Sequence, residues 1–234
     1  MATADPAAKA AHPAQIVTAR PLAVVGAGEH ALVVAEAVRS RPGAWRIVGF
    51  ADAAERDLPA ARDPDFRYLG DDETLRQLLA SDRDGGPALV LGFGGGVQPA
   101  DRAATVEGFG DGVEWVTIVH VAAWVSPAAA LGPGTFVGAA AVVQPGAVAG
   151  RHVIVNTGAI VEHDVLLGDY SHVGPGAAIG GGASVGRGAF VGLGARVRDH
   201  VTIGDGARIG MGAVVVGDVA AGETVAGVPA RAVR

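Results

Sequence analysis

The second half of the chain carries aliphatic side chains at every sixth position. This ladder runs from Val119 to Ala221, and its 18 members are Val, Leu, Ile or Ala without a gap. Glycine follows the aliphatic residue in 11 cases, and Ala, Ser or Thr stands two positions before it in 14. A helix repeats every 3.6 residues and a single strand every two, so neither explains a period of six.

A solenoid of short strands explains this period. If each hexapeptide forms one side of a triangular coil, three of them make an 18-residue turn and their aliphatic residues stack inside a prism. The 18 hexapeptides then give six turns. We expect the glycine after each aliphatic residue to relieve the corner, where a positive φ disfavours other residues. A Gly- and Ala-rich linker, the alternative, would not keep this register.

The first half alternates between period-two and helical patterns. Residues 21–30 (PLAVVGAGEH) predict a strand that enters a glycine turn, and residues 29–40 predict the helix that follows. Gly26, Gly28 and Ala31 have the spacing of a dinucleotide-type fingerprint. The pattern continues with predicted strands at 45–51, 88–91 and 114–119, helices at 73–80 and 100–107, and a glycine-rich turn from Gly92 to Gly96.

We therefore predict three segments: a flexible leader at 1–20, an α/β Rossmann-like βαβαβ domain at 21–118 and a parallel β-helix at 119–234. One βαβαβ unit accommodates a mononucleotide, whereas an NAD site uses two. We expect the turn at Gly28, Glu29 and His30 to hold a nucleotide-bearing substrate, with Asp52 near the ribose hydroxyls. The alternative that these glycines only form tight turns stays open.

Composition and charge remove several classes of function. The chain has no cysteine, which excludes disulfides, thiolate metal sites and thiol nucleophiles. The first 119 residues hold 11 basic and 17 acidic side chains, and Lys9 is the only lysine, so nucleic acid is a disfavoured partner. No apolar run has the roughly 20 residues of a membrane span, and the start lacks signal-peptide features. We expect a cytoplasmic protein.

Candidate chemistry centres on residues 156–164 (NTGAIVEHD). Without cysteine, acyl transfer proceeds through a serine ester or directly, and direct transfer needs a base with a pKa near neutrality. His163 lies at an outward corner of the predicted prism, and Asp164 can hold one ring nitrogen and raise the basicity of the other. A solvated surface histidine is the alternative. No two histidines are five residues apart, so we expect no metal site.

Spacing also places other residues relative to His163. His172 is nine residues away, half a predicted turn, so one prism cannot bring both rings to one substrate but two packed prisms can. Positions 18 apart stack, which puts Gly181 above His163 and Met211 above Leu193.

The chain resembles bacterial sugar O- and N-acetyltransferases of the left-handed β-helix hexapeptide-repeat superfamily, typified by sialic-acid O-acetyltransferase and UDP-4-amino-sugar N-acetyltransferase of the bacillosamine pathway. The motifs that carry the resemblance are GAGEH (26–30), GFAD (49–52), NTGAIVEHD (156–164), GDYSHVGPGA (168–177) and GVPAR (227–231). The resemblance implies a homotrimer, acetyl-CoA in the groove between adjacent prisms and a nucleotide-linked sugar on the Rossmann-like domain.

Residue roles follow from this resemblance. It makes His163 the general base, with Asp164 beside it, and His172 a CoA contact. The other residues that it assigns to CoA are Asn156, Gly181, Leu193 and Met211. The sequence does not choose among the cations available for CoA phosphates, which are Arg196, Arg198, Arg208, Arg231 and Arg234.

The loop that begins at Gly92 departs from the family. Its members commonly have Gly-Asp-Asn or Gly-Asn-Asn followed by an arginine, whereas this chain has GFGGGVQ (92–98) with Arg102 further on. That loop faces the sugar nucleotide, so the identity of the sugar stays open.

The leading hypothesis is direct acetyl transfer from acetyl-CoA to the amino group of a nucleotide-linked 4-amino sugar, with His163 as base, in polysaccharide biosynthesis. The alternatives are O-acetylation of a sugar such as sialic acid and a non-catalytic trimeric scaffold that binds a nucleotide sugar. An NAD-dependent oxidoreductase is disfavoured because the second nucleotide-binding half is missing.

Overall fold

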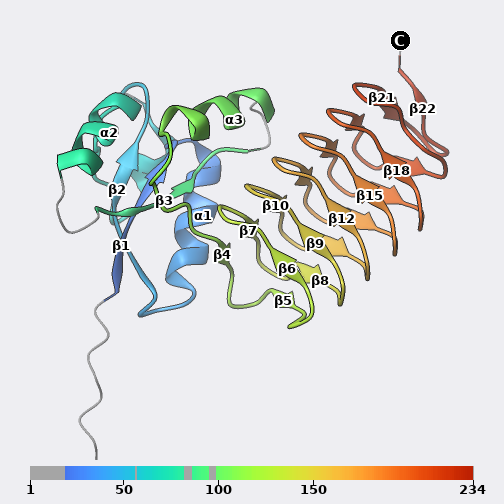
Figure 1. The fold of residues 1–234 in the computed structure, drawn as a ribbon, viewed down its shortest axis with the longest axis horizontal. Coiled ribbons are helices and arrows are strands. Elements are labelled where there is room, and N and C mark those ends of the chain that lie inside the picture. Colours follow the sequence, from blue (N-terminus) through green and yellow to red (C-terminus); the bar gives the residue numbers. More distant parts are fainter. Residues whose placement is uncertain (1–18, 56, 82–85, 95–98, 234) are drawn as a thin grey trace, which may run out of the picture.

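The computed structural model describes residues 19–55, 57–81, 86–94 and 99–233. A small α/β domain lies at one end of a long β-solenoid, and the described chain ends at the other end (Figure 1). This confirms both predicted architectures. Most of the predicted leader lies outside the described residues, as do Gly95, Gly96 and Gln98 of the glycine-rich loop.

The α/β domain is built on a three-stranded parallel sheet with the order β2-β1-β3. Leu22 to Val25 are almost completely buried, because helices and loops cover both faces of the sheet. Its strands are β1 (Arg20–Val25), β2 (Trp45–Ala51) and β3 (Ala88–Leu91). Its helices are α1 (Glu29–Arg39), the 3-10 helix η1 (Pro59–Arg62), α2 (Asp72–Ser81) and α3 (Pro99–Gly108).

The strand predicted at 114–119 is divided between the two domains. Trp115 forms a single bridge with Leu89, whereas Ile118 and Val119 form β4, the first strand of the solenoid. Ile118 donates its N–H to Thr135 of the next turn at 2.9 Å. The segment therefore leaves the small sheet after one bridge because the prism supplies its next backbone partners.

The solenoid has three sheets, one for each side of the prism. The first contains β4 (Ile118–Val119), β7 (Phe136–Val137), β10 (Ile154–Val155), β13 (His172–Val173), β16 (Phe190–Val191), β19 (Arg208–Ile209), β21 (Thr224–Ala226) and β22 (Arg231–Ala232). The second contains β5 (Trp124–Val125), β8 (Val142–Val143), β11 (Ile160–Val161), β14 (Ala178–Ile179), β17 (Arg196–Val197) and β20 (Val214–Val215). The third contains β6 (Ala130–Leu131), β9 (Val148–Ala149), β12 (Leu166–Leu167), β15 (Ser184–Val185) and β18 (Thr202–Ile203).

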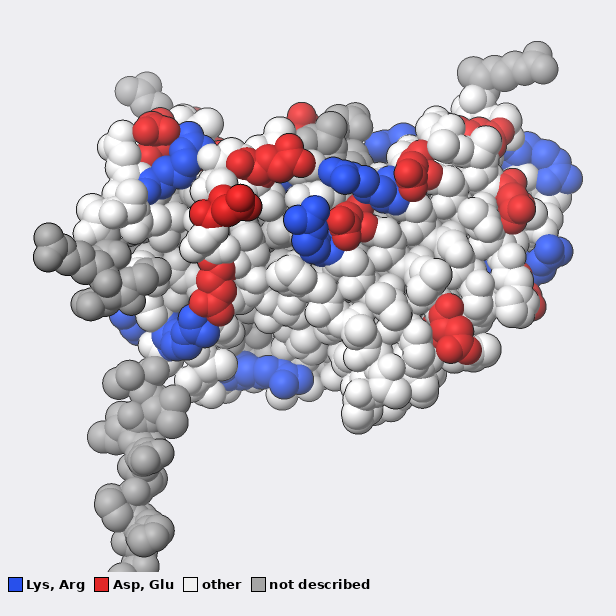
Figure 2. All heavy atoms as spheres, in the orientation of Figure 1, with Lys and Arg blue, Asp and Glu red and all other residues white. Residues whose placement is uncertain are grey.

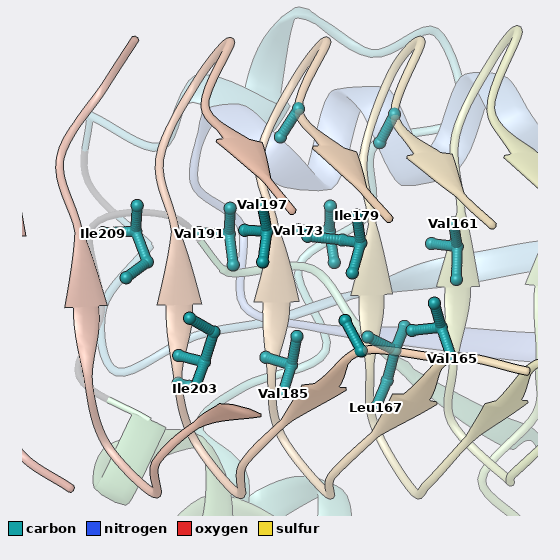
Figure 3. Packing of buried hydrophobic residues seen from close by; sticks show 14 of the residues in the cluster. Val161, Val165, Leu167, Val173, Ile179, Val185, Val191, Val197, Ile203 and Ile209 are labelled. Carbon is teal, nitrogen blue, oxygen red and sulfur yellow. The ribbon is translucent and has the colours of Figure 1, made fainter. Parts of the chain in front are cut away.

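The predicted 18-residue turn sets the strand register. Ile154 pairs with His172, and Val161 pairs with Ile179, each 18 residues further on. In the short strands other than β22, whose Ala232 is exposed, the second residue points inward, so Val161, Val173 and Ile179 are fully buried in the prism (Figure 3). Because strand neighbours are residues 18 apart, side chains on the outer surface also form stacked ladders.

The glycines occupy the corners for a different reason from the one predicted. Positive φ occurs three residues after the aliphatic position, as at Gly158 (64°) and Gly182 (64°), and not directly after it. Glycine stands directly after the aliphatic residue because a Cβ there would strike the next turn. At Gly174 such an atom would lie 2.7 Å from the Val191 carbonyl oxygen. The left-handed corner also accepts non-glycine residues: Ala140, His152, Asp164, Tyr170 and His200.

The aliphatic ladder ends one step earlier than predicted. Ala221 is exposed, and Val219 and Val225 enter the core in its place. Arg208 pairs with Thr224, only 16 residues further on, so the last turn is two residues shorter. This shortening moves Ala221 out of the inward register.

Candidate active site

A cavity of about 600 Å³ lies where the α/β domain meets the prism. Helix α1 packs against Phe136 and Ile154 on the outer surface of the first sheet, and the cavity opens beside this contact. It gathers residues from both predicted parts of the site. Seven of the predicted residues line it: Gly28, Glu29, His30, Gly92, Asn156, His172 and Leu193.

His172 contributes a buried neutral ring to this cavity. Its side chain projects from β13, packs edge-on against Phe190 at 5.1 Å between ring centroids and is 4% exposed. Burial, with smaller effects from the charges of Arg102 and His30, lowers the pKa of His172 to about 3. The Asn156 amide nitrogen lies 3.2 Å from Nε2, so a neutral ring accepts a hydrogen bond there.

His30 brings a second imidazole, from the first turn of α1. Its ring packs edge-on against Phe136 at 5.3 Å, and burial followed by the charge of Arg102 lowers the pKa to about 4. Its Nε2 atom is buried and has no hydrogen-bond partner among the described residues. A buried nitrogen without a partner is costly, so a polar group of a ligand would be stabilised at this point.

The glycine turn before α1 forms one wall of the cavity. Gly26 has a φ of 92°, and Gly28 is the N-cap of α1. A Cβ at Gly28 would meet nothing within 4 Å, so the backbone faces open space. The first turn of a helix has N–H groups without intrahelical partners, and these attract anions such as phosphate.

Asp52 lies outside the cavity and supports the turn instead. Its carboxylate accepts the N–H groups of Ala27 and Ala53, each at 2.7 Å. The predicted contact of Asp52 with a ribose therefore stays a prediction, and its two oxygens already have partners in the turn.

Gly92 lies at the carboxyl end of β3, where the strands crowd together. A Cβ there would lie 2.6 Å from a methyl group of Val24 and would also strike the Gly26 carbonyl. The next residue, Phe93, lies against Gly26 and presents its ring to the cavity. An aromatic ring thus forms part of the wall of the cavity at the end of β3.

His163 and Asp164 occupy a separate, exposed corner after β11. His163 Nδ1 lies 2.9 Å from the Asp164 carboxylate, and this hydrogen bond is the main cause that raises the pKa of His163. Asp164 has a φ of 57°, the left-handed corner conformation, which aspartate tolerates better than most residues. The His163 side chain is 62% exposed.

Gly181 stacks on His163 as the spacing predicted. A Cβ at position 181 would lie 2.5 Å from His163 Nε2, so the imidazole occupies the space that a side chain would fill. Leu193 and Met211 project from successive turns and are 58% and 81% exposed. Leu193 borders the cavity, whereas Met211, Gly181 and the His163 pair do not.

Comparison with known proteins places this arrangement in a family. Residues 21–88 match the PglD N-terminal domain family. Perosamine N-acetyltransferase (PerB) from Caulobacter crescentus is 34% identical over 92% of this chain and 97% of its own, with a TM-score of 0.81. The acetyltransferase domain of PglB from Neisseria gonorrhoeae is 36% identical over 92% of this chain and all of its own, with a TM-score of 0.81. No curated protein sequence matches the chain.

The chain belongs to the hexapeptide-repeat sugar acetyltransferase family. Structures of these two family members contain bound ligands: CoA with GDP-perosamine in PerB, and acetyl-CoA in the PglB domain. Other structures of the perosamine enzyme carry asparagine or alanine in place of one histidine. WeeI from Acinetobacter baumannii shares the fold at 24% identity, with a TM-score of 0.73 and coverage of 92% of this chain and all of its own.

Sequence reasoning missed two aromatic walls of the cavity in this family member, Phe93 and Phe190. Phe190 could have been predicted from the repeat, because the outward residues of the first sheet lie 18 apart in the sequence. That ladder consists of Phe136, Ile154, His172, Phe190 and Arg208. Phe93 carried no periodic signal, since it follows the last residue of a strand in a loop.

No group of three or more His, Asp or Glu side chains among the described residues is placed to hold a metal ion. None of the helices described is both long and apolar enough to cross a membrane.

Proposed function

We propose that the chain transfers the acetyl group of acetyl-CoA to the amino group of a nucleotide-linked 4-amino sugar. The observation that carries this proposal is the His163–Asp164 pair at an exposed corner of the prism, in which the carboxylate holds Nδ1 and Nε2 lies over Gly181. Its relatives PerB and the PglB domain are acetyltransferases that bind CoA or acetyl-CoA, and PerB also binds GDP-perosamine.

His163 acts as the general base in the proposed reaction. The neutral Nε2 takes a proton from the sugar amine as the amine nitrogen attacks the thioester carbonyl carbon. The tetrahedral intermediate then collapses by breaking the carbon–sulfur bond, and the imidazolium returns the proton to the departing thiolate. Asp164 holds the Nδ1–H tautomer and stabilises the imidazolium between these two steps.

The cavity suits the nucleotide-sugar substrate. The glycine turn and the first turn of α1 offer backbone N–H groups to the diphosphate. His30 and His172 present neutral ring nitrogens to the base or sugar. Val33, Phe93 and Phe190 supply apolar walls.

We also propose that the active unit is a homotrimer in the cytoplasm. His163 and the cavity lie on different sides of one prism, so a neighbouring prism would complete the site. Trp124 and Ile160 on the second sheet, and Val148 and Leu166 on the third, are exposed outward side chains that a trimer would bury. Figure 2 shows a broad area without charged residues over the middle of the solenoid. Leu193 and Met211 would then contact the pantetheine arm.

A thiol-release assay tests the function directly. The purified protein is incubated with acetyl-CoA and a panel of GDP-, UDP- and CMP-linked amino and hydroxy sugars. We expect free CoA only with 4-amino acceptors, and mass spectrometry should then show an N-acetyl product. Release with hydroxyl acceptors alone would favour O-acetylation. Nucleotide-sugar binding in calorimetry without acetyl-CoA binding would favour a scaffold and contradict the proposal.

A further inference from the structure

Helix α3 places a buried arginine at the corner of Tyr170, two residues before His172, which lines the cavity. Arg102 is 2% exposed, and its guanidinium donates hydrogen bonds to the carbonyl oxygens of His152 and Tyr170, the latter at 3.1 Å. These two residues lie 18 apart on successive turns and both adopt the left-handed corner conformation. One side chain of the α/β domain therefore bridges two corners of the prism.

The carbonyls explain the position of Arg102 but not its charge. Arg196 bridges the corner carbonyls of Gly176 and Gly194 in the same way, at 3.1 and 2.9 Å, on the exposed surface. At the buried site no acidic side chain among the described residues pairs with Arg102. A neutral donor would bind a carbonyl without the free-energy cost of an unpaired buried cation.

The charge of Arg102 is retained and reaches the cavity. Burial lowers the pKa of Arg102 to about 10, which leaves the guanidinium protonated at neutral pH. After burial, the charge of Arg102 is the next cause that lowers the pKa of His30 and of His172. The Tyr170 carbonyl that Arg102 binds is two residues before His172 on the cavity wall, so the cation lies within electrostatic range of whatever binds there.

The cavity itself lacks positive side chains. Of its described lining residues only Glu29 is charged, and the whole chain has a net charge of −6. A diphosphate would therefore bind beside a carboxylate, in an acidic protein, with backbone N–H groups as its direct donors. A fixed cation one layer behind the wall offsets this unfavourable potential.

We infer that Arg102 is a positioning residue that makes the cavity electropositive for the diphosphate of the nucleotide sugar without touching it. This inference rests on the proposed function for its ligand. A guanidinium suits the role better than an ammonium group, because a buried lysine readily loses its proton. The two carbonyl hydrogen bonds fix the charge in place, and this charge adds to the effect of burial, which is the main cause that keeps His30 and His172 neutral.

Two neutral variants separate the charge from the hydrogen bonds. Arg102→Gln keeps an N–H donor for a corner carbonyl, whereas Arg102→Met keeps neither the donor nor the charge. Calorimetry with GDP, UDP and inorganic pyrophosphate should show affinity reduced about 10-fold or more in both. Arg151→Gln is the matched control, since it removes an exposed cation next to His152 and should leave affinity within about twofold.

Histidine titration by NMR tests the charge of Arg102 directly. If Arg102 only held the two carbonyls in place, its replacement would leave the histidine pKa values unchanged. The pKa values of His30 and His172 should rise in Arg102→Gln, while the melting temperature shows whether the fold is kept. Unchanged histidine pKa values, or wild-type affinity in Arg102→Gln with loss only in Arg102→Met, would overturn the inference. In the wild-type protein, GDP must also perturb the NMR signals of His30 and His172. If GDP perturbs other residues and not these two, the inference is overturned even if neither variant folds.

The same experiment separates this inference from the proposed function. If the wild-type protein releases no CoA with any acceptor but Arg102→Gln still weakens pyrophosphate binding, the function fails and the role of Arg102 stands. If acetyl transfer occurs and the variant binds GDP as the wild type does, the function stands and the role of Arg102 fails.

Discussion

His163 depends on two neighbours, one along the chain and one in the next turn. Asp164 fixes Nδ1, and Gly181 leaves the space that the ring occupies. His163→Ala should lower kcat by about 100-fold or more, the usual effect of a lost general base, because the amine must then attack without proton removal. Steady-state thiol release measures this, with size-exclusion chromatography to check the assembly. His200→Ala, at a different corner of the prism, should keep wild-type turnover, and equal loss in both variants would contradict the assignment.

Asp164 sets the pH range in which His163 can act. The hydrogen bond raises the pKa of His163, so the fraction of neutral, active base grows as pH rises through this raised value. The pair stabilises the folded state while the ring is protonated, and this contribution disappears at higher pH. Asp164→Asn should shift the acidic limb of the kcat/KM profile to lower pH and reduce the plateau. A profile that does not move would exclude Asp164 as the partner.

The role of Gly181 in positioning the His163 ring can be tested by substitution. In Gly181→Ala the new methyl group would strike His163, so the ring must leave its place beside Asp164. We expect kcat to fall about 10-fold or more, the scale of a misplaced catalytic group, and the His163 Nδ1 proton signal in NMR to change. Gly217→Ala is the matched control, because a Cβ there meets nothing within 4 Å. If both variants keep the wild-type signal and rate, Gly181 has no positioning role.

At the scale of elements, the hexapeptide period predicted the strands because one residue in six must be aliphatic to fill the prism. It predicted Val161 and Ile179 as core residues, and both are fully buried. It could not predict the shortened last turn, because Val219 and Ala221 are both small and apolar. It also gave the wrong reason for the glycine that follows each aliphatic residue. That glycine is needed because the next turn lies too close for a Cβ, and this distance between turns cannot be read from one hexapeptide.

Stability measurements can distinguish a core position, Ile179, from Ala221, which the period predicted to be in the core and the structure exposes. Ile179→Ala removes buried methyl groups between two turns and should lower the free energy of unfolding by about 2–5 kcal/mol. Ala221→Ser, at an exposed position, should change it by less than about 0.5 kcal/mol. Thermal unfolding of both variants provides the comparison. A large loss at Ala221 would contradict the register described for the last turn.

At the scale of the whole molecule, the sequence predicted positions along the prism better than contacts between the two domains. The repeat placed His163 and His172 on different sides of the prism, because both belong to one periodic element. The contact of α1 with Phe136 and Ile154, which creates the cavity, joins two domains and follows from no single pattern. Arg102 could not be interpreted from the sequence for the same reason, since its partners lie 50 and 68 residues away.

The proposed assembly makes a prediction at this scale. Val148→Glu places a charge on an outward strand position that a trimer would bury, so we expect dissociation into monomers. Activity should fall with the molar mass measured by light scattering, because His163 would lose the neighbouring cavity. Leu78→Glu, on exposed helix α2, is the control and should stay trimeric. A fully active monomer would refute the shared site.

The 18-residue repeat also gives the molecule an internal unit of length. Each turn advances the prism by roughly 4.8 Å, the spacing of neighbouring strands. Corners on the same edge of the prism therefore lie a whole number of such steps apart. Deleting one 18-residue turn between His163 and Met211 would bring these two residues one step closer and keep each on its own edge, whereas deleting six residues would rotate everything downstream by one side of the triangle. A change in the length of the bound molecule can thus be matched by adding or deleting whole turns.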